Sequence, residues 1–167
     1  MADLVIRTAT PADAPALDAL IGEHQREGHL LPRELSELRR RAPRFVVAEA
    51  AGRLLACAEL APLSPRVAEI RSLVVARDVR RVGLGARIVG ELRARATAAG
   101  FESLCAFTHD ARLFVRHNFS IVPHVWLPEK IATDCASCPL FRQCGQQAMV
   151  LPLRLESRAV ASRRAVA

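Results

Sequence analysis

Long hydrophobic runs are missing from this chain of 167 residues. No uninterrupted apolar stretch reaches the ~18 residues that a membrane-spanning helix needs, so we expect no membrane partner. The start, Met1-Ala2-Asp3, lacks the basic residues followed by an apolar stretch that mark a secretory signal. These two absences predict a cytoplasmic protein.

Aromatic residues are scarce, at 4% of the sequence, and tyrosine is absent. Proteins that bind single-stranded nucleic acids stack the bases on aromatic side chains. A net charge of +7 suits an anionic partner, but the basic residues are spread out and have few aromatics among them. We therefore expect no nucleic-acid partner, and a phosphorylated cofactor is the anionic partner that remains.

Lysine is almost absent, because Lys130 is the only lysine among the 24 basic residues. Cysteine occurs five times, and Cys57 and Cys105 lie in apolar runs typical of core strands. The other three form Cys135-x-x-Cys138 followed by Cys144. A structural zinc site needs four ligands, so this trio predicts no metal site, while a redox-labile thiol pair stays open.

Hydrophobic periodicity and turn residues predict an α/β domain at residues 1–156, followed by a basic tail at 157–167. Helices are expected from Thr10-Pro11 to Gly28, from Pro32 to about residue 41, from Leu84 to Gly100 and over 111–117. Strands are expected at 4–7, 45–50, 54–60, 68–75, 103–107, 119–123 and 148–153. The element order is β-α-α-β-β-β-α-β-α-β-β, which predicts a sheet of mixed direction with helices on its faces.

A glycine-containing loop joins the predicted central strand to the longest predicted helix. Its residues are Arg80, Arg81, Val82, Gly83, Leu84, Gly85 and Ala86. Glycines there let backbone N–H groups converge on an anion, and the helix N-terminus adds partial positive charge. A dinucleotide fingerprint is excluded because Ile88 replaces its third glycine, and a nucleotide-triphosphate loop because Gly-Lys-Ser/Thr is absent. The loop therefore predicts a pyrophosphate site.

The pattern Arg80-x-x-Gly83-x-Gly85 resembles the acetyl-CoA motif of the GNAT N-acetyltransferases, and the element order matches that family over residues 3–153. The resemblance implies the GNAT fold, a mixed and mostly antiparallel sheet with helices on both faces and a splayed central strand pair. It also implies acetyl-CoA as co-substrate, with its pyrophosphate on the loop and its pantetheine along Leu73, Val74 and Val75. Phe114 occupies the position where the wider family often has a tyrosine near the cofactor.

Three stretches resemble the short bacterial form of N-acetylglutamate synthase. They are Gly28 to Arg33, Ala68 to Val75, and Leu127 to Lys130 with the cysteine-containing insert at 131–146 that follows. This resemblance implies acetylation of the α-amine of glutamate, a reaction of arginine biosynthesis.

The acceptor and the catalytic groups follow from the same reading. Arginine suits a carboxylate because its planar fork donates two parallel hydrogen bonds. We expect Arg33, Arg71 and Lys130 to hold the substrate, Glu69 to act as the base and His109 to assist as an acid. Phe114 cannot donate a proton, so the tyrosine that could act as an acid is missing here. The CoA thiolate can also leave without being protonated.

Two other functions stay open from the sequence. The same fold acting on another amine, such as a drug or a protein N-terminus, keeps the cofactor loop and changes only the acceptor. A non-catalytic module that binds CoA or senses an amino acid is consistent with the missing tyrosine. The sequence does not decide between a monomer and a homodimer.

Overall fold

The computed structural model of the protein describes residues 3–26 and 32–153. The helix break expected at Gly28 and the expected tail at 157–167 lie outside the described residues. The chain forms two compact units, Met1–Ala61 with Ile70–Leu92, and Pro62–Glu69 with Arg93–Ala167.

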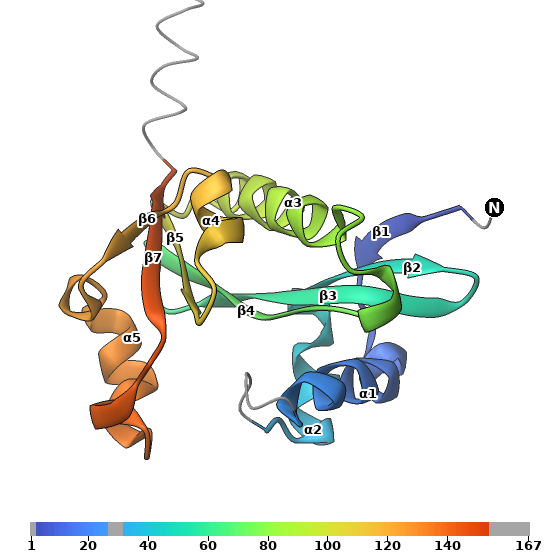
Figure 1. Cartoon of the computed structure of the whole chain (residues 1–167), viewed down its shortest axis with the longest axis horizontal. Coiled ribbons are helices and arrows are strands. Elements are labelled where there is room, and N and C mark those ends of the chain that lie inside the picture. The colour runs from blue at the N-terminus through green and yellow to red at the C-terminus, as the bar shows by residue number, and fades with distance from the viewer. Residues whose placement is uncertain (1–2, 27–31, 154–167) are drawn as a thin grey trace, which may run out of the picture. The chain divides into compact units, whose positions relative to one another are not determined.

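Seven strands form one sheet in the order β1-β2-β3-β4-β5-β7-β6. The sheet is mostly antiparallel, and β4 and β5 run parallel. The strands are β1 Val5–Thr8, β2 Phe45–Ala50, β3 Arg53–Pro62, β4 Val67–Val75, β5 Ser103–Thr108, β6 Ser120–Val122 and β7 Gln147–Pro152 (Figure 1). The expected mixed, mostly antiparallel sheet is thereby confirmed.

The first unit packs helices α1 (Ala14–Gln25) and α2 (Leu35–Arg41) on the same face of β2 and β3 (Figure 1). Its buried core includes Leu17 and Leu38 from the helices and Phe45 from β2. Strands β2 and β3 meet in a two-residue turn, in which Ala51 and Gly52 both have positive φ, of 51° and 71°. That conformation matches the twist of a hairpin, and it joins the strands that the sequence predicts at 45–50 and 54–60.

A cluster of charges fixes the start of the first unit. The guanidinium of Arg7 donates to both carboxylate oxygens of Asp13 at 2.8 Å and to Glu49 at 2.9 Å. These contacts hold the pKa of Asp13 well below its usual range, chiefly through the hydrogen bonds from Arg7. The cluster ties β1 to β2 and to the 3-10 turn Pro11–Asp13, where α1 was expected to begin.

Helix α3 (Leu84–Ala98) buries Leu84, Ile88, Leu92 and Ala96 at intervals of four residues, together with Val89. This is the stripe that the sequence predicts. The helix ends before Gly100, which has a φ of 84°, and Phe101 donates its N–H to the carbonyl of Ala96 at 3.1 Å. A glycine in the left-handed region is a common helix stop, as expected from the sequence.

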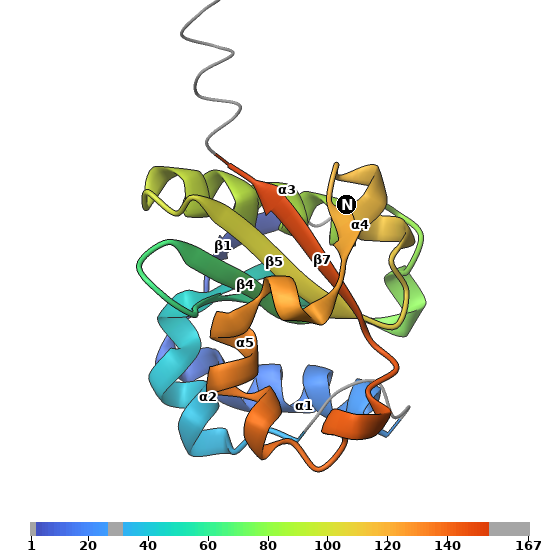
Figure 2. The same cartoon turned by 90° about the vertical axis from the view of Figure 1, so that its left-hand side faces the viewer.

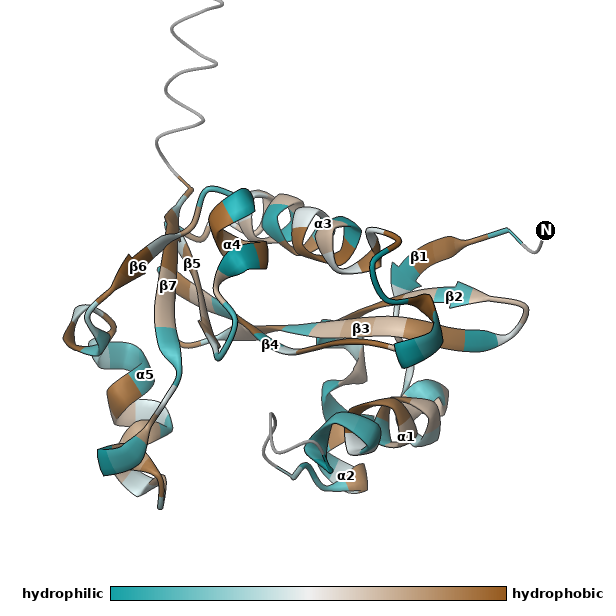
Figure 3. Ribbon diagram, viewed as in Figure 1, coloured by the Kyte–Doolittle hydropathy of each residue, from teal (hydrophilic) through white to brown (hydrophobic). Residues whose placement is uncertain are grey.

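The second unit is built around β7, which lies between β5 and β6 and runs antiparallel to both. Figure 2 shows β7 beside β5. Its core includes Val67, Cys105, Leu127 and Ala148. Helices α4 (Arg112–Arg116) and α5 (Pro128–Thr133) complete this unit. Helix α5 is too short to show a periodic pattern and was not predicted. Strand β6 lies at an edge of the sheet and is coloured hydrophobic in Figure 3. Its Ile121 is exposed.

No helix within residues 3–26 and 32–153 has both the length and the apolar character needed to cross a membrane.

Candidate functional site

The predicted pyrophosphate loop follows a 3-10 turn at Arg77–Val79 and ends in the first turn of α3. Arg81 and Gly83 both take positive φ, at 68° and 86°. A Cβ built on Gly83 would meet no atom within 4 Å, so the space beside this glycine is open. The first N–H groups of an α-helix have no partner inside the helix and attract anions. This open loop at the start of α3 fits the pyrophosphate of a CoA molecule.

Side chains of the loop divide into an exposed and a buried set. Arg80, Arg81 and Val82 are exposed, whereas Leu84 is buried and Gly85 and Ala86 are half-buried. Arg80 donates to Nε2 of His24 at 2.5 Å and to the carbonyl of Val75 at 3.3 Å. Arg80 therefore links the end of β4 to α1, a contact that the sequence did not predict.

The strand before the loop has a local distortion. Ser72 has a φ of 50°, a left-handed conformation that is uncommon for residues other than glycine. Such a residue within a strand re-aims the backbone groups on both sides of it. It directly precedes Leu73, Val74 and Val75, the residues expected to line the pantetheine, of which Val74 is buried and the other two are half-buried.

Arg33 lies in a buried ion-pair network of the first unit. Its guanidinium donates to Glu59 at 2.6 Å, to Glu37 at 2.9 Å and to the hydroxyl of Ser72 at 3.1 Å. Its side chain is only 10% exposed, and Glu59 is completely buried. The structure thus gives the expected substrate ligand two carboxylate partners of its own, and a substrate-binding role for Arg33 stays a prediction.

Glu69, the expected base, is buried on β4 and forms an ion pair with Lys130 of α5 in the second unit. The ammonium of Lys130 donates to the two oxygens of Glu69 at 2.8 and 2.9 Å and to Asp134 at 2.9 Å. It also lies 5.1 Å from the centre of the Phe107 ring. The sequence predicted both charged residues as site residues, but it did not predict that they pair.

The remaining predicted residues lie on separate elements. Arg71 is half-buried and follows Glu69 by two positions on β4. Side chains along a strand alternate between the two faces of the sheet, so these two lie on the same face. His109 is exposed just after β5, where its ring lies beside Gly145. Phe114 is buried and packs edge-to-face on Phe119, with ring centres 5.2 Å apart.

The cysteines differ in their surroundings. Cys57 and Cys105 are buried, as expected, and burial raises the pKa of the Cys57 thiol to about 12. Cys135 and Cys138 are half-buried, Cys144 is exposed, and burial raises the pKa of the Cys135 thiol. Within the described ranges, no three or more His, Cys, Asp or Glu side chains are arranged to hold a metal ion.

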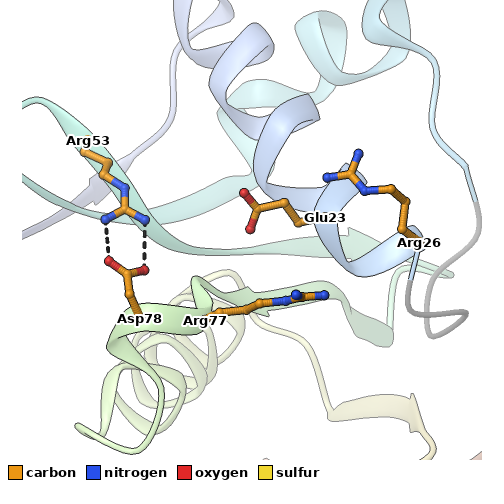
Figure 4. Close-up of a pocket in the computed structure, with 5 residues that line it drawn as sticks. All are labelled: Glu23, Arg26, Arg53, Arg77 and Asp78. Atoms are coloured by element: carbon orange, nitrogen blue, oxygen red, sulfur yellow. Dashed lines mark hydrogen bonds and ion pairs between the residues drawn. The ribbon is translucent and has the colours of Figure 1, made fainter.

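A polar pocket of about 350 Å³ lies in the first unit and was not predicted from the sequence. Arg53 and Asp78 form a two-pronged ion pair there, at 2.6 and 2.9 Å (Figure 4). The remaining lining residues are Glu23, Arg26 and Arg77. Three arginines and two carboxylates line this pocket, so residues of the chain itself balance most of its charge.

Comparison with known proteins connects this geometry to one family. The sequence profile described as the acetyltransferase (GNAT) family matches residues 13–119. The uncharacterized N-acetyltransferase CT2212 of Chlorobaculum tepidum is 30% identical over 152 residues, which cover 91% of this chain and 98% of that protein.

Two further proteins are similar over part of their length. An amino-acid acetyltransferase of Ralstonia nicotianae is 36% identical over 62% of this chain, but the chain spans only 23% of that relative. N-acetylglutamate synthase of Neisseria gonorrhoeae, solved with coenzyme A and N-acetyl-glutamate, superposes with a TM-score of 0.79 at 26% identity. That match covers 92% of this chain and 36% of the synthase. The family match and the CT2212 match extend over most of the chain, so the chain belongs to the GNAT family and is an acetyl-CoA-dependent N-acetyltransferase.

Proposed function

We propose that the chain acetylates the α-amine of a small anionic amino acid, and we assign glutamate as the acceptor. The observation that carries this proposal is the buried carboxylate of Glu69 on β4, held by Lys130 and two residues before Arg71. This strand thus offers a proton acceptor for an ammonium group and a cation for a carboxylate. Similarity to an amino-acid acetyltransferase and to a synthase solved with N-acetyl-glutamate supports the same acceptor class.

The proposed reaction is direct attack of the neutral amine on the thioester carbonyl. Glu69 takes a proton from the ammonium, directly or through a water molecule. The new N–C bond forms, the nitrogen releases its extra proton to solvent, the C–S bond breaks and CoA leaves as a thiolate. Backbone N–H groups after the distortion at Ser72 are our candidates for stabilising the oxyanion. His109 is our candidate for protonating the thiolate.

Acceptor choice is assigned to Arg71, because its planar guanidinium can donate two parallel hydrogen bonds to the side-chain carboxylate of glutamate. A neutral amide in place of that carboxylate loses a hydrogen bond to a charged group, which is worth about 1.5–3 kcal/mol. Release of CoA thiol should therefore be fastest with glutamate among the twenty amino acids. Arg71→Gln should raise the KM for glutamate by about tenfold or more. It should also lower the ratio of kcat/KM for glutamate to kcat/KM for glutamine.

The matched control is Arg66→Gln, since Arg66 is a mostly exposed arginine near the start of β4, paired with Glu102. We expect its KM for glutamate to equal that of the wild type. A wild type that prefers glutamine, or a preference unchanged by Arg71→Gln, would refute the glutamate assignment. Turnover with another amine would leave the acetyltransferase assignment intact.

The loop assignment is tested at Gly83. Its φ of 86° and the open space beside it mean that Gly83→Val both strains the backbone and fills the proposed pyrophosphate seat. We expect the Kd for acetyl-CoA, measured by calorimetry, to rise by about tenfold or more, which corresponds to ~1.4 kcal/mol. Gly90→Val is the control, because Gly90 is an exposed glycine of α3 with an ordinary φ. Equal affinities in the two folded variants would rule the loop out.

A further inference from the structure

We propose that Lys130 is a positioning residue that orients Glu69 through its ammonium group, with Asp134 as the third member of the arrangement. This role differs from the binding of a substrate carboxylate that the sequence suggests. The inference rests on the proposed role of Glu69 as the base.

The donors of Lys130 are the first argument. A lysine ammonium has three N–H donors and no acceptor. In this structure those donors meet three carboxylate oxygens, two from Glu69 and one from Asp134, at 2.8 to 2.9 Å. The side chain is 14% exposed and Glu69 is 3% exposed. A substrate carboxylate at Lys130 would have to displace one of these oxygens.

Charge is the second argument. Glu69, Lys130 and Asp134 together carry one cation and two anions, so the group has an excess of negative charge. The face of the Phe107 ring, which carries partial negative charge, also lies close to the ammonium. A negative group attracts the ammonium of an incoming amine and repels its carboxylates. The site around Lys130 therefore suits the reacting end of the acceptor.

The residue type is the third argument. Lys130 is the only lysine in a chain whose other basic residues are arginines. Arginine presents a rigid planar fork, whereas an ammonium is a compact charge whose three donors diverge in three directions. Oxygens that approach from β4 and from the next turn of α5 suit the ammonium better than the fork. The arrangement of the three oxygens therefore explains why position 130 is a lysine and not an arginine.

Local structure holds Lys130 in this place. Helix α5 begins at Pro128, directly after the buried Leu127, and Lys130 and Asp134 lie four residues apart. The N–H of Asp134 donates to the carbonyl of Lys130 at 3.0 Å. The thiol of Cys135 also lies within electrostatic range of Lys130 and Asp134. The titratable groups that these contacts place at Lys130 are Glu69, Asp134 and Cys135.

The experiment compares steady-state kinetics of the full chain and four variants, using whichever amine the wild type acetylates fastest. In Lys130→Met we expect kcat to fall by about tenfold or more, with the KM of the acceptor changed less than about threefold. The acid limb of the kcat/KM profile should move to higher pH, because a buried carboxylate without its cation takes up a proton more readily. Lys130→Arg should recover little of kcat.

Asp134→Asn gives a test of opposite sign. This variant keeps the ammonium on Glu69 and removes the competing carboxylate, so the acid limb should move to lower pH. Asp134→Asn retains the buried pair of Glu69 and Lys130, so it still tests the proposal if Lys130→Met does not fold. Glu129→Gln, a neighbour on α5, is the control and should match the wild type.

Two results would overturn the proposal. A rise in acceptor KM of about tenfold in Lys130→Met, with kcat and the acid limb unchanged, would make Lys130 a substrate ligand. An acid limb that stays in place in both Lys130→Met and Asp134→Asn would leave it a structural residue. Failure of the glutamate assignment is seen separately, as a different preferred amine in the wild type.

Discussion

Glu69→Gln is expected to lower kcat by about 10²–10⁴-fold, the usual contribution of a general base, while the Kd for acetyl-CoA stays at the wild-type value. Glutamine keeps the size of the side chain but cannot take the proton of an ammonium group. Only the neutral fraction of the amine would then react. The loss of rate should therefore shrink as the pH rises toward the pKa of the free amine.

The measurement is the pH dependence of kcat, with acetyl-CoA binding followed by calorimetry as a test of folding. Glu49→Gln is the matched control, because Glu49 is also a strand glutamate that pairs with a cation, Arg7. It should keep the wild-type kcat. A Glu69→Gln enzyme with wild-type kcat near neutral pH would show that another group, or water alone, removes the proton.

Much of this fold follows from local sequence signals. The apolar residue at each turn of α3 and the positive-φ pair at Ala51 and Gly52 are local features, and the sequence predicts both elements where the structure has them. Short helices and strands contain too few residues to show a hydrophobic period in the sequence. Helix α5 has six residues, the sequence predicts no helix there, and only its last three residues fall in the expected insert at 131–146.

The partners of charged residues could not be predicted, because they depend on tertiary pairing. Lys130 and Glu69 are 61 positions apart in the sequence, and Arg33 and Glu59 are 26 apart. The sequence predicts site roles for Arg33, Glu69 and Lys130, but it does not show which residues pair with them. The left-handed conformation of Ser72 gave no signal either, since serine has no special preference for it.

Glu59 is the clearest example of this limit, and it leads to the largest expected effect on stability. It lies on β3 within an apolar run and is completely buried. Its Oε2 accepts from Arg33 at 2.6 Å, whereas its Oε1 accepts no hydrogen bond from the described residues. Arg41 comes only within 3.8 Å of Oε1. Arg33 is therefore the principal counter-charge of a carboxylate that water does not reach.

Arg33→Met should lower the free energy of unfolding by about 3–5 kcal/mol, because it leaves a buried charge without its partner. Urea unfolding followed by circular dichroism measures this loss. Arg41→Met is the matched control on α2, since Arg41 is 35% exposed and pairs mainly with Glu37 at 3.1 Å. An ion pair of that kind contributes only about 0–1 kcal/mol.

The double variant Arg33→Met with Glu59→Met separates the cost of an orphaned charge from the value of the pair. Replacing a buried ion pair by apolar side chains of similar volume is often neutral or stabilising by about 1–4 kcal/mol. The double variant should therefore regain most of the stability that Arg33→Met loses. Equal losses in Arg33→Met and Arg41→Met, or a double variant no more stable than Arg33→Met, would show that Arg33 acts through packing on Phe45, 5.4 Å away, rather than through Glu59.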